Sequence, residues 1–211
     1  MALKFNQSKG SAIKSTIDAF QFKDGNNSVR IVGDILARYV YWVKGENNKN
    51  IPMECLAFNR DEERFDRKEQ DWVAEYYPDL NCTWSYAVQC IEDGKVKVVN
   101  LKKKLWEQVV TAAEDLGDPT DPDTGWDIKF VKKKTGPHVF NVEYTLQPLK
   151  CSPRPLTDEE RELIKDLKSM DDVMPRPTPA AQKELLDRIR KADEPEEKDE
   201  EALEDEFKVT K

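Results

Sequence analysis

The stretch that decides the fold is Thr83–Val110, with the sequence TWSYAVQCIEDGKVKVVNLKKKLWEQVV. Its first third, Thr83–Ile91, is rich in aromatic and β-branched residues that are apolar at alternate positions, and in Lys95–Leu101 valines alternate with lysines. This period of two is typical of β-strands. The acidic turn between them ends in Gly94, which accepts a positive φ without a steric penalty. The stretch therefore predicts a β-hairpin.

The apolar pattern changes its period directly after this hairpin. Leu105, Val109 and Ala112 recur at helical spacing, with Trp106 beside them. The change of period predicts a helix that follows the second strand without a loop, so Lys102–Lys104 lies at the junction of strand and helix.

The lysine junction allows two interpretations. Lysines neutralise phosphate groups and flat rings stack on unpaired bases, so a basic cluster near Trp84 and Tyr86 suits a single-stranded nucleic acid. A solvated lysine run that caps an ordinary β-β-α unit explains the same residues, and Thr83–Val110 alone leaves both open.

The same stretch resembles the gene-32-type single-stranded DNA-binding proteins of tailed phages, also called helix-destabilising proteins. The matching part is a strand that ends in basic residues, followed by an apolar residue, a tryptophan, an acid and an apolar helical turn, here Lys103–Val109. The resemblance covers residues 27–155 and the layout of both tails. It implies an OB-fold that binds single-stranded DNA without sequence preference and coats and protects unwound strands in phage DNA replication, recombination and repair. Independently of the resemblance, a single histidine, no Ser/His/Asp arrangement and no Gly-rich phosphate loop lead us to expect neither an enzyme nor a cofactor.

Composition and charge divide the chain. Of 211 residues, 38% are hydrophobic and 36% are charged, which is too polar for one packed globule of this length. Residues 1–155 carry 23 basic and 23 acidic side chains, whereas residues 156–211 carry 11 and 19, so the net charge of −8 comes from the last quarter. A neutral body with basic clusters is compatible with nucleic-acid binding.

We expect a mainly β protein with helices (α+β), built on a five-stranded OB barrel with an inserted helical flap and C-terminal helices. The expected domains are an N-terminal arm (1–25), the OB core that binds DNA (26–155), a helical extension (156–191) and a disordered acidic tail (192–211). The expected strands are 27–34, 35–44, 51–58, 83–91, 95–101, 126–134 and 138–149. The expected helices are the flap at 60–77, one after Leu101, one from Thr157 and one at 180–191.

Residues 35–44 carry rings on both faces of the expected strand. Tyr39 and Tyr41 share one face, and Arg38, Trp42 and Lys44 share the other, so some rings face outward whichever face is buried. The predicted nucleic-acid-binding residues are Arg30, Arg38, Tyr39, Tyr41, Trp42, Lys44, Arg60, Arg64, Arg67, Lys68, Trp72, Trp84, Tyr86, Lys95, Lys97, Lys102, Lys103, Lys104, Lys129, Lys132, Lys133 and Lys134.

The cysteines give a weak signal for a metal. The gene-32-type family holds a structural zinc with cysteines and a histidine, but this sequence has no CxxC and no histidine between Cys55 and Cys90. Scattered thiols lack the close-pair spacing of zinc sites, so we predict no metal and expect free thiols. The charged segment 60–77 would replace the zinc module as a flap over DNA.

Both tails are candidate partner sites. The resemblance implies that a basic N-terminal motif binds the neighbouring protomer along DNA, and Lys14–Thr16 is a reduced version of it that lacks the extra basic residues; a frayed leader explains the same residues. The resemblance also implies that the acidic tail recruits replication and recombination proteins, with Leu203 and Phe207 as anchors; a tail that only keeps the protein soluble is the alternative. No apolar run is long enough to span a membrane, so we expect the cytoplasm of the host cell.

Three other functions stay open at this point. The protein could be an adaptor that acts through its late helices and tail, or an OB protein that binds RNA, since stacking and phosphate contacts barely distinguish the sugar. A nuclease is the enzymatic alternative, although the acids show no spacing that singles out a metal site.

Overall fold

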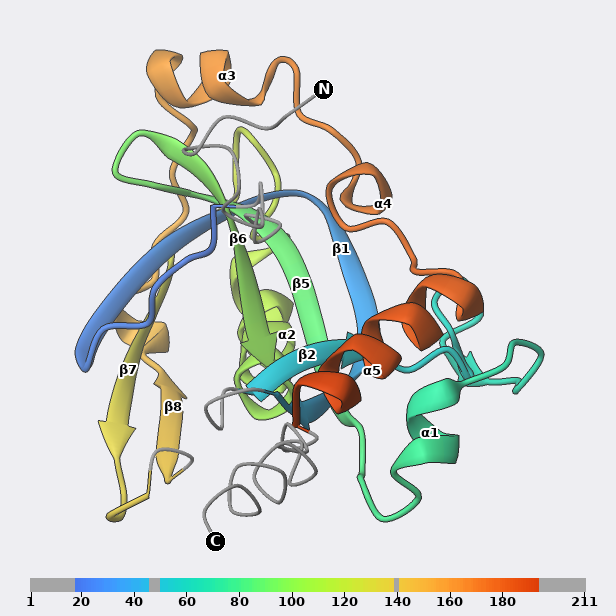
Figure 1. The fold of residues 1–211 in the computed structure, drawn as a ribbon. Coiled ribbons are helices and arrows are strands. Elements are labelled where there is room, and N and C mark those ends of the chain that lie inside the picture. The colour runs from blue at the N-terminus through green and yellow to red at the C-terminus, as the bar shows by residue number, and fades with distance from the viewer. Residues whose placement is uncertain (1–17, 46–49, 139–140, 194–211) are drawn as a thin grey trace, which may run out of the picture. The chain divides into compact units, whose positions relative to one another are not determined.

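The computed structural model describes residues 18–45, 50–138 and 141–193, so the Lys14–Thr16 motif and the anchors Leu203 and Phe207 lie outside the described residues. The chain forms two compact units (Figure 1). Unit 1 comprises Met1–Arg38 and Trp84–Arg176, and unit 2 comprises Tyr39–Thr83 and Pro177–Lys211. The structure is a mixture of helices and a predominantly antiparallel sheet.

Unit 1 contains a sheet with the strand order β6-β5-β1-β7-β8. Its strands are β1 (Gly25–Lys44), β5 (Thr83–Glu92), β6 (Lys95–Lys102), β7 (Ile128–Lys134) and β8 (Val142–Leu146). The β5–β6 hairpin is confirmed, as is the helix that follows β6 directly, α2 (Lys103–Leu116). The expected strands 126–134 and 138–149 correspond to β7 and β8, which pair with each other. Within the described part of the chain, β6 and β8 are the two ends of this order and do not pair, so the sheet is not closed.

Strand β1 corrects one prediction. Residues 27–34 and 35–44 are not two strands but parts of one continuous strand, Gly25–Lys44. Gly33 has a φ of +71°, and a Cβ there would lie 2.6 Å from Cδ2 of Leu167, so glycine provides both the bend and the close approach. The first part of β1 pairs with β7, and Val40–Lys44 pairs with β2 (Asn50–Glu54) in unit 2.

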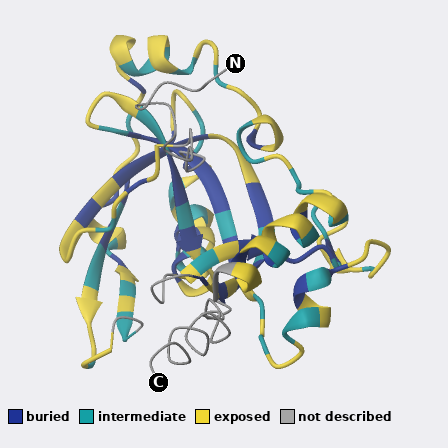
Figure 2. Cartoon of the chain, viewed as in Figure 1, coloured by how far each residue is buried: buried dark blue, intermediate teal, exposed yellow. Residues whose placement is uncertain are grey.

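The main core of unit 1 lies between the sheet and α2. Leu105, Val109 and Ala112 of α2 are buried, as the helical spacing predicted. They pack with sheet residues such as Val29, Val88 and Val99. Figure 2 shows buried residues along β1, β5 and β6. This core fixes where α2 starts, and therefore where its N-terminal lysines lie.

The C-terminal part of unit 1 crosses the other face of the sheet. After β8 come a short 3₁₀ helix (Pro148–Lys150), α3 (Asp158–Ile164) and α4 (Met170–Val173). The helix predicted from Thr157 is confirmed, and Thr157 caps it in a capping box with Glu160. Met170 packs on Leu36 and Ala87, so this segment is part of the folded unit.

Unit 2 corrects the prediction of a helical flap over residues 60–77. The segment begins with a small hairpin, β3 (Phe58–Asn59) and β4 (Arg64–Phe65), and only α1 (Trp72–Tyr76) is helical. The side-chain oxygen of Asn59 accepts hydrogen bonds from two turn amides, which favours the turn over a helix. Asp71 then caps α1. The expected strand 51–58 accordingly divides into β2 and β3.

Helix α5 (Pro179–Asp193) completes unit 2, in agreement with the predicted helix at 180–191. Gln182, which is 2% exposed, donates from Nε2 to the Glu54 carbonyl (2.9 Å) and accepts from the Trp72 amide (2.7 Å). The Arg190 guanidinium lies 4.8 Å from the ring centre of Tyr76. No helix among the described residues is long and apolar enough to cross a membrane.

Candidate nucleic-acid interface

Three aromatic side chains form a continuous row in unit 1. Trp84 and Tyr86 alternate on β5 and lie on the same face of the strand, with ring centres 5.2 Å apart. Trp106 of α2 continues the row, 5.0 Å from Tyr86. All three are partly buried, and Tyr86 and Trp106 pack against the main core. We call these three residues the ring row; it is a fixed aromatic surface.

The lysine junction lies where β6 becomes α2. Lys102 is the N-cap of α2 and supplies no side-chain cap, and the first turn contains Lys103 and Lys104 but no acid. The first amides of a helix lack intrahelical partners and carry the positive end of its dipole. Three exposed lysines at such a helix start make this junction favourable for an anion.

The pairing of β5 with β6 places the ring row and the lysine junction at the same end of the hairpin, although Lys102 itself projects from the face opposite to Trp84 and Tyr86. Ser85 lies opposite Lys102, so the rings on either side of Ser85 and the lysines share the end of the hairpin that is remote from its turn. Lys103 and Trp106 are three residues apart on α2 and hence on one helix face. The Lys103 ammonium is 3.8 Å from Glu107, but both side chains are exposed, so this pair is weak.

Arg38 adds a further cation at the same end of the sheet. Its Nη2 donates to Oδ1 of Asn100 (2.7 Å), and Asn100 and Lys102 lie on the same face of β6. Surrounding protein atoms and the positive charge of Arg38 lower the pKa of Lys102. A phosphate near Arg38 and Lys102 would offset their mutual repulsion.

The structure thus places Trp84, Tyr86, Lys103 and Lys104 at one end of the β5–β6 hairpin, and Arg38 and Lys102 at the same end on the opposite face of the sheet. Trp106 belongs to the ring row and Asn100 to the Arg38–Lys102 pair, and neither was predicted. The spacing of Lys103 and Trp106 on a predicted helix was a usable signal for Trp106, whereas nothing in the sequence pairs Asn100 with Arg38.

Other predicted cations of unit 1 lie elsewhere. Lys97 is five residues from Lys102, roughly 17 Å along an extended strand, and it binds Glu92 (2.7 Å) near the hairpin turn, beside Lys95. Arg30 is 2% exposed and donates to the Asp121 carbonyl (2.7 Å). Arg30 lines a separate cavity of about 300 Å³ with Asp127 and Arg154, away from the ring row, so we leave it out of the interface.

The lysines of β7 form a separate group. Lys132 is held by Asp24 (Nζ–Oδ1 2.8 Å), which raises the pKa of the Lys132 ammonium, and it also donates to the Phe22 carbonyl (3.3 Å). Lys133 and Lys134 are exposed, and Lys129 is partly buried. Strand β7 is three positions from β6 in the sheet order, roughly 14 Å at the usual strand spacing.

In unit 2, two predicted residues are buried. Tyr41 is 5% exposed and its hydroxyl accepts a hydrogen bond from the Cys55 thiol (3.4 Å). Burial raises the pKa of Tyr41 and raises that of Cys55 to about 12. Arg60 binds Glu54 through two nitrogens, with Nε–Oε1 at 2.6 Å, and its side chain is 6% exposed. Both residues support the fold, so the interface does not include them.

The remaining predicted residues of unit 2 are at the surface or partly so. Arg64, Arg67 and Lys68 are exposed on the β3–β4 hairpin and just after it. Trp72 is partly covered by Lys183, whose Nζ lies 5.3 Å from the ring centre. Tyr39 packs against Phe58 and Phe65. Exposed Trp42 and Lys44 line a cavity of about 520 Å³ together with Val43 and residues 76–80.

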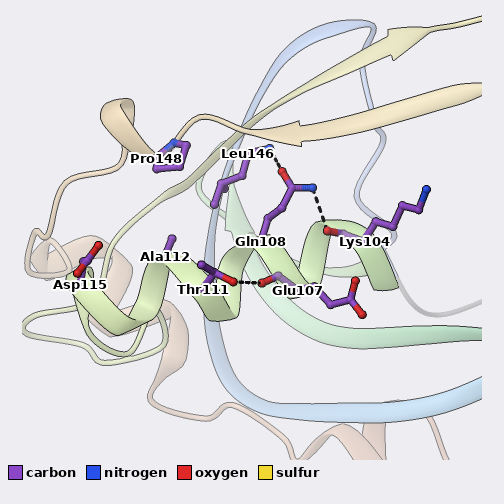
Figure 3. Close-up of a pocket in the computed structure, with 8 residues that line it drawn as sticks. All are labelled: Lys104, Glu107, Gln108, Thr111, Ala112, Asp115, Leu146 and Pro148. Carbon is purple, nitrogen blue, oxygen red and sulfur yellow. Dashed lines mark hydrogen bonds between the residues drawn. The ribbon is translucent and has the colours of Figure 1, made fainter.

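A cavity of about 540 Å³ lies between α2 and β8, with Lys104 at its edge. Figure 3 shows Gln108 reaching from α2 to β8. Its Oε1 accepts from the Leu146 amide (2.9 Å), and its Nε2 donates to the carbonyls of Lys104 (2.9 Å) and Tyr144 (3.3 Å). The side-chain amide of Gln108 thus makes the hydrogen bonds that a neighbouring strand would make with the edge of β8. These bonds hold the first turns of α2 in place.

No three potential metal ligands of the His, Cys, Asp or Glu type come together within the described part of the chain. The four cysteines are free thiols, and Cys55, Cys90 and Cys151 are buried. The site in unit 1 therefore consists of rings, cations and helix amides.

The chain is similar in sequence to a known phage protein. The chain is 31% identical over 163 residues to a protein of Escherichia phage T5 described as a "Probable ssDNA-binding protein". The similarity covers 71% of this chain and 61% of the phage T5 protein, so the chain spans less than two thirds of that relative. No protein-family model matches the chain.

Proposed function

We propose that this protein binds single-stranded DNA without sequence preference. The observation that carries the proposal is the ring row Trp84–Tyr86–Trp106 beside Lys103 and Lys104, which start α2 at one end of the β5–β6 hairpin. Rings stack on any base and lysines bind any phosphate, so this combination recognises single strands rather than a sequence. The name of the phage T5 relative supports the coarser part of this proposal, the binding of single-stranded DNA.

We further propose that unit 1 is a partly open OB barrel. In chain order its strands are β1, β5, β6, β7 and β8, with α2 after the third, and their spatial order is third, second, first, fourth and fifth. OB-folds are five-stranded, partly open barrels that bind oligonucleotides on the face of their second and third strands. Here those strands are β5 and β6, which carry Trp84 and Tyr86 on one face and Lys102 on the other.

In this proposal the residues of the site have distinct tasks. Lys102–Lys104 and Arg38 bind successive phosphates, and the α2 amides add neutral donors. The ring row stacks on unpaired bases, which duplex DNA keeps inside the helix. A protein that covers single strands in this way keeps them unpaired, which suits phage DNA replication, recombination and repair. The site needs no catalytic group, so we propose a binding protein and not an enzyme.

Two finer parts of the proposal concern partners. We propose that the acidic tail, with Leu203 and Phe207, binds replication and recombination proteins, and that the N-terminal arm contacts a second protomer along DNA. Both rest on the resemblance to gene-32-type proteins and on the charge division of the sequence.

The first test is the quenching of tryptophan fluorescence by oligo-dT, compared with duplex DNA of equal length at two salt concentrations. We expect quenching by the single strand that weakens steeply with salt, because ring stacking and counterion release act together. Stacking is worth about 1–3 kcal/mol per base, so Trp84→Leu should raise the Kd by roughly five- to 100-fold.

The matched control is Val110→Ala, which changes an exposed apolar residue of α2 outside the ring row and should leave the Kd unchanged. Equal quenching by duplex DNA would contradict the preference for single strands. The absence of any salt-dependent binding would reject DNA binding and leave the adaptor.

A further inference from the structure

We propose that Phe65, at the β3–β4 hairpin of unit 2, stacks on a base of the bound single strand, with the neighbouring Arg67 on a phosphate. This inference rests on the proposed function and adds a second contact site on a different unit. Phe65 falls within the segment that the sequence predicted as a helix, and it was not among the predicted binding residues.

The ring of Phe65 is exposed and yet held in place. It is 47% exposed, whereas its strand partner Phe58 is 1% exposed. The ring centre lies 5.3 Å from that of Phe58 and 4.7 Å from that of Tyr39. Two rings therefore support Phe65 from the side of the core of unit 2, and nearly half of its surface faces solvent.

The backbone around Phe65 is fixed by hydrogen bonds. The amides of Asp66 and Arg67 both donate to the Ala57 carbonyl (3.1 Å each), and Asn59 donates to the Asp66 carboxylate (2.9 Å). Phe65 also lies between two non-glycine residues with positive φ, Glu63 (+47°) and Arg67 (+52°). Such backbone is unfavourable for residues with a side chain and is more frequent at binding sites. The ring is thus ordered before a ligand arrives, which reduces the entropy lost on binding.

The surroundings of Phe65 favour a base over a protein partner. Residues 61–64 and 67–70 are all exposed, and most are charged, so the ring is an isolated apolar spot. Protein interfaces usually centre on a larger apolar patch, whereas one flat ring suits one unpaired base. Among the described residues the Arg67 side chain makes no ion pair, in contrast to Arg64, which is paired with Glu62. Arg67 is therefore available to a phosphate.

Photo-crosslinking tests the contact directly. Phe65 is replaced by p-benzoylphenylalanine in the full chain, and the protein is irradiated with labelled oligo-dT. We expect a crosslink that unlabelled single strand removes by competition and duplex DNA does not. The same residue placed at Leu149, which is fully exposed in unit 1 outside the ring row, is the matched control and should give no such crosslink.

Affinity measurements separate a stacking role from a structural one. Phe65→Leu keeps an apolar side chain against Tyr39 and Phe58 but removes the flat ring, so we expect a Kd raised roughly five- to 100-fold with an unchanged Tm. Phe65→Trp should bind at least as tightly as the wild type. An unchanged Kd in Phe65→Leu, with no crosslink at position 65, would overturn the inference while DNA binding itself stands. A wild-type protein that binds no oligo-dT would instead reject the proposed function and this inference with it.

Discussion

Two lysine triplets of identical composition occupy different environments in unit 1. Lys102–Lys104 lies at an uncapped helix start, beside the ring row and near Arg38. Lys132–Lys134 ends β7, where Lys132 is bound to Asp24 and to the Phe22 carbonyl. The sequence predicted a DNA contact for both triplets, for the first from its charge and the rings Trp84 and Tyr86 near it, and for the second from its charge alone.

The comparison shows that a basic triplet is informative only together with its neighbours. At the first triplet no acid lies in the first helical turn, so the lysines add to the field of the helix. At the second, one of three charges is already neutralised by a carboxylate. We therefore expect the first triplet to contribute most of the binding free energy that lysines provide, and the second to contribute little.

The largest expected effect is that of Lys102→Gln, Lys103→Gln and Lys104→Gln combined. Each lost phosphate contact lowers the slope of log Kobs against log salt by about 0.7 for single strands. Loss of two or three contacts should therefore flatten the salt dependence clearly and raise the Kd at low salt by at least about tenfold. Fluorescence titrations at several salt concentrations measure both quantities.

The matched control is the same triple substitution at Lys132–Lys134, for which we expect a change of Kd below about threefold, since Lys132 is already paired. Equal effects of the two triple variants would contradict the comparison and place both triplets on the DNA path. Both variants change side chains near the surface, so the Tm should stay close to that of the wild type.

The parts of the fold that the sequence predicted are those with local causes. The β5–β6 hairpin, α2 and α3 follow from periodicity, a glycine turn and a threonine cap. The prediction of two strands at 27–44 was wrong because Gly33 was interpreted as a turn. Gly33 instead bends one continuous strand, and its missing side chain leaves room for Leu167, far along the chain, to pack closely against it.

The flap at 60–77 was predicted as a helix because charges and rings recur there at a spacing that also fits helices. Two side chains decide the local structure instead. Asn59 accepts a hydrogen bond from the amide of Asp61 and so stabilises the turn, and Asp71 caps α1, which therefore begins only at Trp72. The burial of Arg30 and Arg60 depends on partners such as Asp121 and Glu54, and no spacing in the sequence indicates which arginine finds such a partner.

An intermediate effect is expected at Gln108, which holds α2, and with it the first triplet, against β8. Gln108→Leu leaves the Leu146 amide and the Tyr144 carbonyl without this partner. An unsatisfied buried polar group costs about 1–3 kcal/mol, and these two hydrogen bonds are partly buried, so the free energy of unfolding should fall by about 1 kcal/mol. Urea denaturation measures it, and Thr111→Ala, an exposed neighbour on α2, should change it by less than about 0.5 kcal/mol.

The Gln108 variant also tests whether the first lysine triplet depends on the position of α2 or on its charge alone. If the site depends only on local charge, folded Gln108→Leu protein should retain nearly the wild-type Kd for oligo-dT. A Kd raised about tenfold in protein that is still folded would show that the position of α2 against β8, and not charge alone, makes the first triplet effective.

The smallest expected effect concerns Asp24, whose pairing distinguishes the second triplet. Hydrogen bonding and charge from Lys132 hold the pKa of Asp24 below 3.8, and Lys134 adds a minor contribution. Because the folded-state pKa is lowered, the pair stabilises the protein above the unfolded-state pKa near 3.8, and this stabilisation disappears as the pH falls through the folded-state value. Carboxyl NMR titration should show the pKa of Asp24 returning toward 3.8 in Lys132→Met and moving much less in Lys134→Met.

Asp24→Asn releases Lys132, so the Kd for oligo-dT should fall by no more than about twofold. A much larger gain in affinity would mean that Asp24 holds back a lysine on the DNA path, and the two triplets would then be alike in function.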